Sequence, residues 1–422
     1  MKTRMALALL GLSAILFLAL LETQAGALKA GDIIVVDDNA FDGRGGVIKV
    51  DPTTGAQEVI SAGGMFVAPR GVAIDRSGQI IVADLAARAI IRVNPDTAGQ
   101  TLVSSGGLLL VPLAVALDSG GNIIVADAGG ASGSLIRVNP STGEQTLISS
   151  GGLFVDPHGV VVAANGEIFV SETHIDGVHA GAIIKVDPTT GSQTLISSGG
   201  RLIRIVHVTV DSTGQILAAS LGFDGPLSAI VKVDPDTGGQ VVVSSEGLFV
   251  SPTGVAVEAS GDIIMSDQNA FGGSGGVIKV DPVSGSQTVL SPGGLFVDPT
   301  DVEIVHLTFV EIDIKPGSDP NSINLGAEGV IPVAILTTPE FDATTVDVST
   351  LTLSGAAVRL RGKSQNAKGL EDVDADGDLD LVAQFDINEL ELTEGSTVAV
   401  LQGKTLSGED IIGTDSVRVV RQ

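Results

Sequence analysis

Cysteine, tryptophan and tyrosine are absent from this chain of 422 residues, and aromatic residues make up only 3% of it. Without cysteine, the chain has no disulfide framework, thiolate metal site or cysteine nucleophile. Without tryptophan and tyrosine, it lacks the usual platforms on which sugar rings or bases stack. Its twelve phenylalanines are therefore expected to serve mainly in the core.

Positive charge is also scarce, because 50 acidic residues outnumber 23 basic residues and give a formal net charge of −27. Such a field repels phosphate backbones and attracts metal cations, which argues against nucleic acid as a partner. The chain is nevertheless 44% hydrophobic, with 55 Gly and 17 Pro. This balance indicates a folded, all-β protein with many short strands joined by tight turns.

The N-terminal segment has the pattern of a secretory signal peptide. Lys2 and Arg4 precede an uncharged apolar run over residues 5–21, and small residues at Ala-x-Ala spacing follow it. We therefore expect residues 1–27 to be a signal peptide and the protein to be secreted, extracellular or periplasmic, with no membrane attachment after cleavage. The alternative is an uncleaved anchor, because about 17 apolar residues lie at the lower limit for spanning a bilayer.

An internal repeat predicts the architecture. Val-(Asp/Asn)-Pro recurs at intervals of 43 to 48 residues, and each repeat contains four short β-rich segments bounded by turn signals. A period of this length with four strands is typical of a β-propeller blade. The Asp or Asn of the six copies is Asp51, Asn94, Asn139, Asp187, Asp234 and Asp281.

The two ends of the repeat array predict how it closes. Residues 31–37 match the second strand of the repeat, and residues 298–304 match its first strand. We therefore expect six blades over residues 28–309, with the first blade completed by the last strand, which removes open sheet edges. One apolar residue per blade is expected between neighbouring sheets, namely Phe66, Leu109, Phe154, Leu202, Phe249 and Phe296.

These motifs carry a family resemblance. The segments Pro69-Arg-Gly-Val-Ala-Ile-Asp75, Gly78-Gln-Ile-Ile-Val-Ala-Asp84 and Ile183-Ile-Lys-Val-Asp-Pro188 resemble NHL-repeat propellers and, more distantly, gluconolactonase-like and streptogramin-lyase-like propellers. The resemblance covers about residues 31–306. It implies the architecture but no single activity, because such propellers include hydrolases, lyases and pure binding platforms.

One face of the predicted propeller collects the candidate ligand-binding residues, because the first strands begin there and the second strands end there. The candidates are Arg70, His158, Glu172 and His174. Strand-end acids such as Asp84 are expected to accept hydrogen bonds from their own turns rather than to act in catalysis. The expected channel mouth is mostly inert and consists of Arg70, Leu113, His158, Val206, Thr253 and Thr300.

Resemblance to enzymes of this architecture implies sites that the sequence matches poorly. The lyase acting on peptidyl-hydroxyglycine would need Pro-His in several blades to bind zinc, but only His158 fits and His207 is one residue out of phase. A gluconolactonase-like divalent site could use Asp301 and Glu172, with no third ligand evident. Glu172 and His174 also resemble the loop of streptogramin lyases. We assign no catalytic residue.

From about residue 310 the period stops, and residues 310–422 are expected to form a β-sandwich. This region contains Asp-x-Asp-x-Asp-Gly-x-x-Asp, whose alternating carboxylates suit calcium and whose Gly377 permits a sharp bend. The motif resembles calcium loops of dockerins, thrombospondin type 3 repeats and integrin-like hairpins. The predicted ligands are Asp372, Asp374, Asp376, Asp378 and Asp380.

The calcium loop departs from the helical EF-hand. When Asp372 is counted as the first residue of the loop, the twelfth is Ala383, where an EF-hand has a bidentate Glu. The alternative to a calcium site is a merely solvated acidic turn. The segments 312–318 and 329–335 resemble a module appended to many secreted bacterial proteins, and this resemblance implies no function.

The sequence thus predicts a secreted, non-enzymatic binding or scaffold protein with a calcium-stabilised C-terminal domain. The expected partner is an extracellular protein or a small molecule, and we expect a monomer. The alternative is a metal-dependent lactonase or lyase acting at the channel mouth.

Overall fold

The computed structural model describes residues 28–175, 180–222, 228–338, 341–359 and 369–420. The predicted signal peptide lies outside the described residues. Strands dominate, and none of the helices in the described part of the chain has the length and hydrophobicity that a membrane crossing requires. Two short helices, α1 (Ala40–Gly43) and α2 (Ala270–Gly273), each follow the second strand of a sheet.

Within the described residues, six four-stranded antiparallel sheets occupy residues 33–304. Sheet 1 contains β24 (Pro299–Ile304), β1 (Ile33–Asp37), β2 (Gly46–Val50) and β3 (Gln57–Ala62). Sheet 2 contains β4 (Pro69–Ile74), β5 (Ile80–Asp84), β6 (Ala89–Val93) and β7 (Gln100–Ser105). Sheet 3 contains β8 (Pro112–Leu117), β9 (Ile123–Asp127), β10 (Ser134–Val138) and β11 (Gln145–Ser150).

The remaining three sheets repeat this order. Sheet 4 contains β12 (Pro157–Val162), β13 (Ile168–Glu172), β14 (Ala180–Val186) and β15 (Gln193–Ile203). Sheet 5 contains β16 (Ile205–Val210), β17 (Ile216–Ser220), β18 (Ala229–Val233) and β19 (Gln240–Ser245). Sheet 6 contains β20 (Pro252–Val257), β21 (Ile263–Asp267), β22 (Gly276–Val280) and β23 (Gln287–Pro292).

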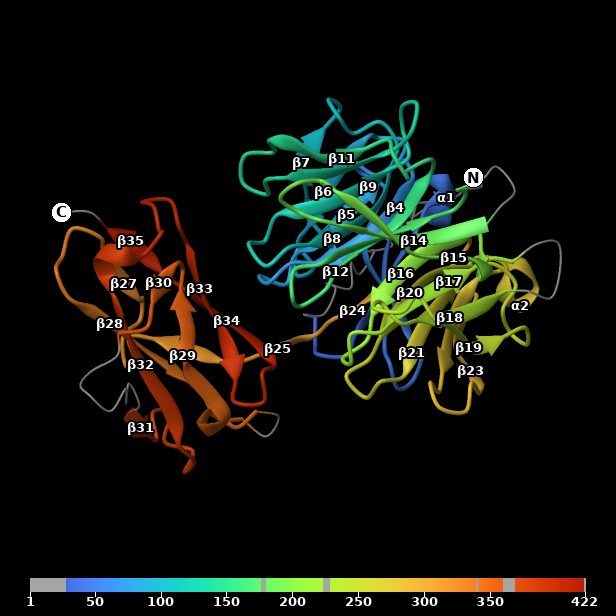
Figure 1. The fold of residues 1–422 in the computed structure, drawn as a ribbon. Coiled ribbons are helices and arrows are strands. Elements are labelled where there is room, and N and C mark those ends of the chain that lie inside the picture. Colours follow the sequence, from blue (N-terminus) through green and yellow to red (C-terminus); the bar gives the residue numbers. More distant parts are fainter. Residues whose placement is uncertain (1–27, 176–179, 223–227, 339–340, 360–368, 421–422) are drawn as a thin grey trace, which may run out of the picture.

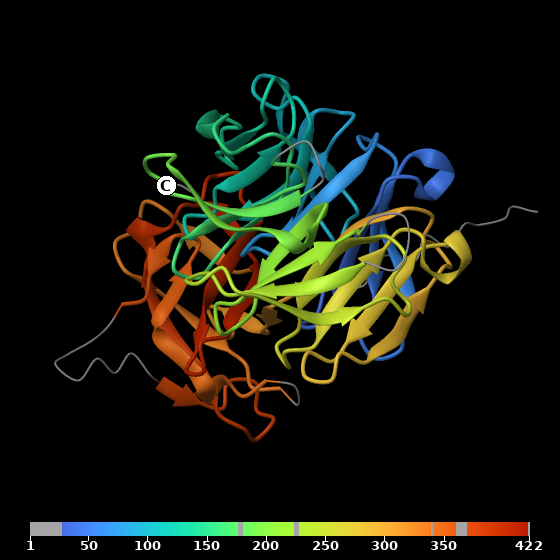
Figure 2. The ribbon, with the colours of Figure 1, turned by 45° about the vertical axis from the view of Figure 1, so that its right-hand side comes forward.

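The six sheets form a closed ring. The first strand of each sheet contacts the first strand of the next, from β4 through β8, β12, β16 and β20 to β24 and back to β4. Figure 1 and Figure 2 show these sheets, coloured blue to yellow, around a common centre, with the C-terminal region in orange and red. Closure depends on sheet 1, in which β24 pairs antiparallel with β1, so that Ile304 lies opposite Ile33.

Packing between the sheets explains why the second strands are mainly apolar and end in a buried polar residue. Each sheet lies between two neighbours, and every residue of β5 (Ile80–Asp84) is buried as a result. The six residues predicted to pack between neighbouring sheets are all buried, as expected: Phe66, Leu109, Phe154, Leu202, Phe249 and Phe296.

A glutamine clasp joins each sheet to the one before it. The Gln100 amide donates to Ser61 Oγ and Gly63 O, and its Oε1 accepts from Met65 N. The same three bonds recur at the first residue of every fourth strand. At the ring closure, Gln57 bonds Ser291 Oγ, Gly293 O and Leu295 N. The clasp residues are Gln57, Gln100, Gln145, Gln193, Gln240 and Gln287.

The C-terminal region has two main sheets over one hydrophobic core. One contains β25 (Leu307–Phe309), β34 (Asp410–Ser416), β33 (Val398–Thr405), β29 (Val346–Leu353) and β30 (Ala356–Ala357). The other contains β26 (Ile312–Ile314), β28 (Val330–Ile335), β32 (Asp380–Asp386) and β31 (Gly369–Glu371). A smaller sheet contains β27 (Ser322–Asn324) and β35 (Arg418–Val420), and two 3-10 turns are η1 (Ala343–Thr345) and η2 (Ile387–Glu389).

Two strand pairs of the C-terminal sheets are parallel instead of antiparallel. β25 and β34 are parallel, as are β27 and β35, because strands from opposite ends of this region run side by side in the same direction. The region also contacts the ring. Gln402 Nε2 donates to the Arg76 carbonyl at 2.9 Å, and Ile412 belongs to the same hydrophobic cluster as Val72 of β4 and Ile80 of β5.

The glutamine clasp gives a test of ring closure. Gln57→Ala removes three hydrogen bonds between sheets 6 and 1, so the free energy of unfolding should fall by about 1–3 kcal/mol in urea titrations. Gln145→Ala is the matched control, because Gln145 makes the same bonds between sheets 3 and 2. In a closed ring the two losses are similar. A loss for Gln145→Ala with none for Gln57→Ala would show an open ring.

Candidate functional site

The six residues expected at the channel mouth line one cavity of about 110 Å³. Each of the six stands near the start of the first strand of its sheet, where the pairing register with the second strand shifts. In sheet 2, for example, Pro69 pairs with Asp84 and Gly71 pairs with Ala83, so Arg70 between them has no partner residue on β5. The cavity also has lining residues that were not expected. Its wall consists of Arg70, Leu113, Ala114, His158, Val206, His207, Leu221, Thr253, Gln268, Thr300 and Asp301.

Several polar side chains in this cavity already join neighbouring sheets. His158 Nδ1 lies 2.9 Å from the Val206 carbonyl, Thr253 donates to the Pro299 carbonyl at 2.8 Å, and Thr300 donates to that of Pro69 at 3.2 Å. The bond to Val206 leaves Nε2 as the unprotonated nitrogen of a neutral His158. Burial lowers the pKa of His158, which keeps the ring neutral at physiological pH.

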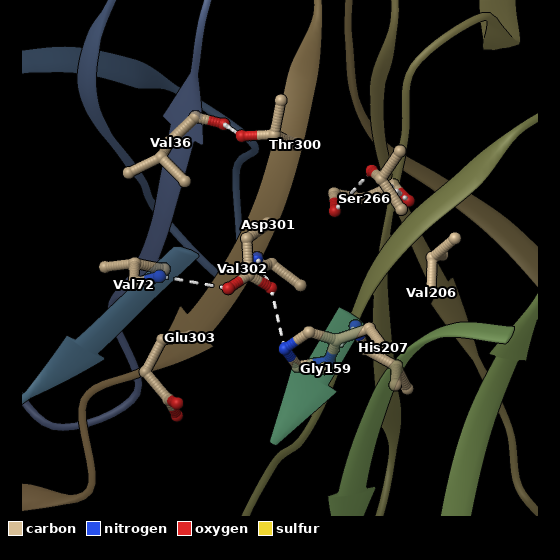
Figure 3. A network of polar contacts seen from close by, with 12 residues as sticks. Val36, Val72, Gly159, Val206, His207, Ser266, Thr300, Asp301, Val302 and Glu303 are labelled. Atoms are coloured by element: carbon tan, nitrogen blue, oxygen red, sulfur yellow. Dashed lines mark hydrogen bonds and ion pairs between the residues drawn. The ribbon is translucent and has the colours of Figure 1, made fainter. Parts of the chain in front are cut away.

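A buried ionic pair lies in the channel, as Figure 3 shows. His207 Nε2 is 3.1 Å from Asp301 Oδ1, and the two side chains are only 13% and 3% exposed. The Asp301 carboxylate also accepts from Val72 N and Val302 N, and His207 Nδ1 lies 3.3 Å from Val255 N, from which it accepts when the ring is neutral. Both ring nitrogens and both carboxylate oxygens are therefore engaged.

Glycine makes room for this pair. His207 and Asp301 each follow a channel-mouth residue, and the equivalent residues of the other sheets are Gly71, Ala114, Gly159 and Gly254. A Cβ on Gly159 would lie 2.8 Å from the His207 Cα, and one on Gly254 would lie 2.7 Å from Asp301 Oδ1. This position carries glycine or alanine in the other four sheets. The two ionisable residues that replace them were the signal in the sequence from which the pair could have been found.

The channel environment shifts the pKa values of its ionisable groups. Burial alone would lower the pKa of His207, but the Asp301 carboxylate, together with Glu303 and Val255 N, outweighs burial and the pKa is raised. Burial, with Asp301 adding to it, raises the pKa of Glu303 to about 7. Glu303 accepts from Ile304 N and lies further along β24, below the ionic pair in Figure 3.

Glu172 does not reach the cavity. It is fully buried, and its carboxylate accepts hydrogen bonds from Val155 N, Asp156 N and His174 N. Burial raises its pKa to about 7. Glu172 thus fixes the loop that leads into β12, and it does not face a ligand.

The strand-end acids of four other sheets make equivalent bonds, and these bonds reach further than the turn that the sequence suggested. Asp84, for example, accepts from Val67 N and Ala68 N, 17 and 16 residues earlier, as well as from Ala87 N. The loop leading to each first strand is therefore anchored to the end of the second strand. The acids are Asp37, Asp84, Asp127 and Asp267.

His174 also stands outside the cavity, beside Asp156. Its Nδ1 is 2.9 Å from Thr173 Oγ and 3.5 Å from Asp156 Oδ2, which accepts the Thr173 hydroxyl at 2.5 Å. Of the four candidates for the ligand face, Arg70 and His158 thus line the cavity together, while Glu172 and His174 do not.

The acidic loop of the C-terminal region brings three of its five predicted ligands together. Asp372, Asp374 and Asp376 each offer an oxygen within 4.8 Å of the others. Asp380 is buried, and its two oxygens accept from Thr337 N and Val373 N, so it anchors the loop. Asp378 carries a buried Oδ1 without a hydrogen-bond partner.

Charge accumulates in this acidic loop. Desolvation and the neighbouring carboxylates raise the pKa values of Asp374 and Asp378. Gly377 has φ +103°, a conformation that side chains rarely adopt, so the turn that gathers the carboxylates depends on this glycine. The donor set of exposed carboxylate oxygens fits a hard divalent cation.

Comparison with known proteins adds the fold. No protein-family model and no curated protein sequence matches the chain. Among solved structures, a chain of "Crystal structure of Nidogen/Laminin Complex" matches with a TM-score of 0.54 and 15% identity, over 64% of this chain and 97% of that chain. The ring of sheets is a β-propeller. At 15% identity, this similarity supports a shared fold and no shared function.

The ionic pair in the propeller channel can be tested by a double-mutant cycle. Asp301→Ala leaves His207 buried without its partner, so the free energy of unfolding should fall by about 3–5 kcal/mol. His207→Ala combined with Asp301→Ala should cost less than the sum of the single changes. An additive result would contradict the pairing.

The sign of the pH dependence follows from the raised pKa of His207. The stabilisation by the pair is full below the ordinary histidine value of 6.5 and is lost as the pH rises through the folded value. The coupling energy from urea unfolding should therefore be larger at pH 6 than at pH 9. A coupling energy that grows with pH would contradict this assignment.

Proposed function

We propose that this chain is a secreted, non-enzymatic binding or scaffold protein, built on a six-bladed, NHL-like β-propeller with a calcium-stabilised C-terminal β-sandwich. The signal-peptide pattern supports export to an extracellular or periplasmic location, and we expect the mature protein to act as a monomer. Its partner would be an extracellular protein or a small molecule.

The main observation in favour of a binding face is a set of exposed apolar residues around the cavity, called the rim here. Its residues each stand three positions before a cavity-lining residue, and their side chains are exposed although the preceding Phe or Leu is buried. Their exposed fractions run from 36% to 54%. The rim consists of Val67, Leu110, Val155, Val250 and Val297.

The rim is held rigidly in place. A strand-end carboxylate accepts the backbone N–H of each rim residue, as Asp84 does for Val67 and Asp267 does for Val250. A rigid apolar surface loses little conformational entropy on binding, and exposed apolar groups gathered on one face are typical of interaction sites. These properties favour a docking surface.

The alternative, a metal-dependent lactonase or lyase at the channel mouth, has weaker support. His207 has no nitrogen left for a metal or a proton transfer, and Glu172 is committed to backbone amides. In the described ranges, the side chains that gather closely enough to hold a metal are those of the acidic loop, residues 372–376. An enzyme would have to rearrange the channel to assemble a site.

Calcium suits the acidic loop because three of its carboxylates lie close together and repel one another without a cation between them. Asp372, Asp374 and Asp376 would hold the ion, and the unpartnered Oδ1 of Asp378 is a further oxygen nearby. The bound ion would order this turn. It supplies no chemistry to the propeller face.

Calcium binding predicts a ligand-dependent stability of the full chain. At a calcium concentration 100-fold above Kd, the gain should be about 2.7 kcal/mol, seen as a higher Tm for unfolding of the C-terminal region. Asp374→Ala with Asp376→Ala should abolish the gain. Asp96→Ala with Asp236→Ala, which removes two exposed acids of the ring, should keep it. An unchanged calcium response in the first variant would contradict the site.

The binding face can be tested with photo-cross-linking residues at Val155 and Val250. In the native extracellular fraction, both positions should give one defined cross-linked species. Val241 on the outer strand β19 is the control, because it is 64% exposed but lies away from the rim. Equal cross-linking from Val241, or lactone or lyase turnover that depends on His158, would overturn the proposal.

A further inference from the structure

Three charged residues meet where the ring closes. Asp38 follows β1 and Asp298 precedes β24, so both flank sheet 1, which is built from the two ends of the ring. Arg70, at the start of β4 in sheet 2, places its guanidinium 2.9 Å from Asp38 Oδ2. Asn39 Nδ2 donates to Asp298 Oδ2 at 3.4 Å.

Each carboxylate has one oxygen that nothing satisfies. The Asp38 side chain is only 9% exposed, and its Oδ1 is buried without a hydrogen-bond partner. Asp298 Oδ1 is likewise buried without a partner. The two carboxyl groups lie within hydrogen-bonding range of each other. Each of these two interacting carboxyl groups thus keeps a buried acceptor that lacks a donor, and a single shared proton supplies one.

Sheet 6 contains a neutral version of the same arrangement. Its loop after the second strand is nearly identical in sequence, and Asn269 there donates to Ser251 Oγ as Asn39 does to Asp298. Gln268 stands in place of Asp38, Ser251 in place of Asp298, and Thr300 in place of Arg70. All three charges are thus present at one junction and absent at the other, which indicates that they act as a unit.

We propose that Asp38 and Asp298 share one proton, which ties β1 to β24 and makes closure of the propeller pH-dependent. The charged groups around the pair are Arg70 from β4 and Asp37 from β1. Arg70 balances one of the two carboxylates, so an unprotonated pair leaves a buried negative charge. The proton removes that charge. This property is independent of what the rim binds.

The electrostatics agree with this geometry. Burial raises the pKa of Asp38 to about 7, Arg70 opposes the rise, and Asp298 and Asp37 add to it. Because the folded value lies above the ordinary value of 3.8, the native protein holds a proton that the unfolded chain releases. The stabilisation is full below about pH 4 and is lost as the pH rises to about 7.

Thermal unfolding of the full chain between pH 4.5 and 8.5 tests the shared proton in wild type and Asp38→Asn. Asparagine keeps a donor at this position at every pH. The Tm of wild type relative to Asp38→Asn should therefore fall by several degrees from pH 4.5 to 7 and stay level above. Subtracting the Tm of Asp38→Asn from that of wild type at each pH cancels the contribution of Glu172 and Glu303, because both residues titrate in both proteins. A constant difference across the range would overturn the proposal.

A second measurement covers the case in which the variant folds poorly. Carboxyl ¹³C NMR can follow the titration of Asp38 in the aspartate-labelled wild-type chain. The Asp38 signal is the one that is missing from the spectrum of Asp38→Glu, and its titration midpoint should lie near pH 7. A midpoint near 4 would contradict the shared proton. The sheet 6 residues, introduced as Asp38→Gln with Asp298→Ser, should leave a ring whose stability lacks this pH-dependent component.

Discussion

The pairing of β24 with β1 is the interaction on which the rest of the propeller depends. It joins strands that are more than 260 residues apart, so that Ile33 lies opposite Ile304. Without it, the fully buried β1 would become an exposed apolar edge, which favours aggregation. Closing so long a loop costs little more than closing a short one, because loop entropy grows only logarithmically with length. The Gln57 clasp, equivalent to five others, adds to closure at the same junction.

The candidate binding face follows from that closure. A complete ring brings the starts of six first strands to one opening, where they enclose the small cavity. The strand-end carboxylates then anchor the preceding loops and hold apolar residues such as Val67 and Val155 outward. Glu172, the strand-end acid that the sequence offered as a candidate for ligand binding, is engaged in building this face. That is the physical reason for favouring binding over catalysis.

The sequence predicted the features that repeat and missed those that occur once. The four-stranded units, the buried Phe66 and its equivalents, and the placement of Arg70 and His158 at one opening all follow from a fixed phase within the repeat. The contact of His207 with Asp301 could not be predicted, because it depends on two sheets meeting across the channel. Glu172 looked reactive because its amide partners lie in a loop 16 and 17 residues earlier.

We propose that metal binds at the acidic loop and not in the propeller. Elemental mass spectrometry of the full chain, purified without chelators, tests it most directly when wild type is compared with Asp374→Ala/Asp376→Ala. We expect about one calcium per wild-type chain and no stoichiometric metal in the variant. Stoichiometric metal retained by the variant would indicate a second metal site outside the acidic loop and would favour a metal-dependent enzyme over a binding protein.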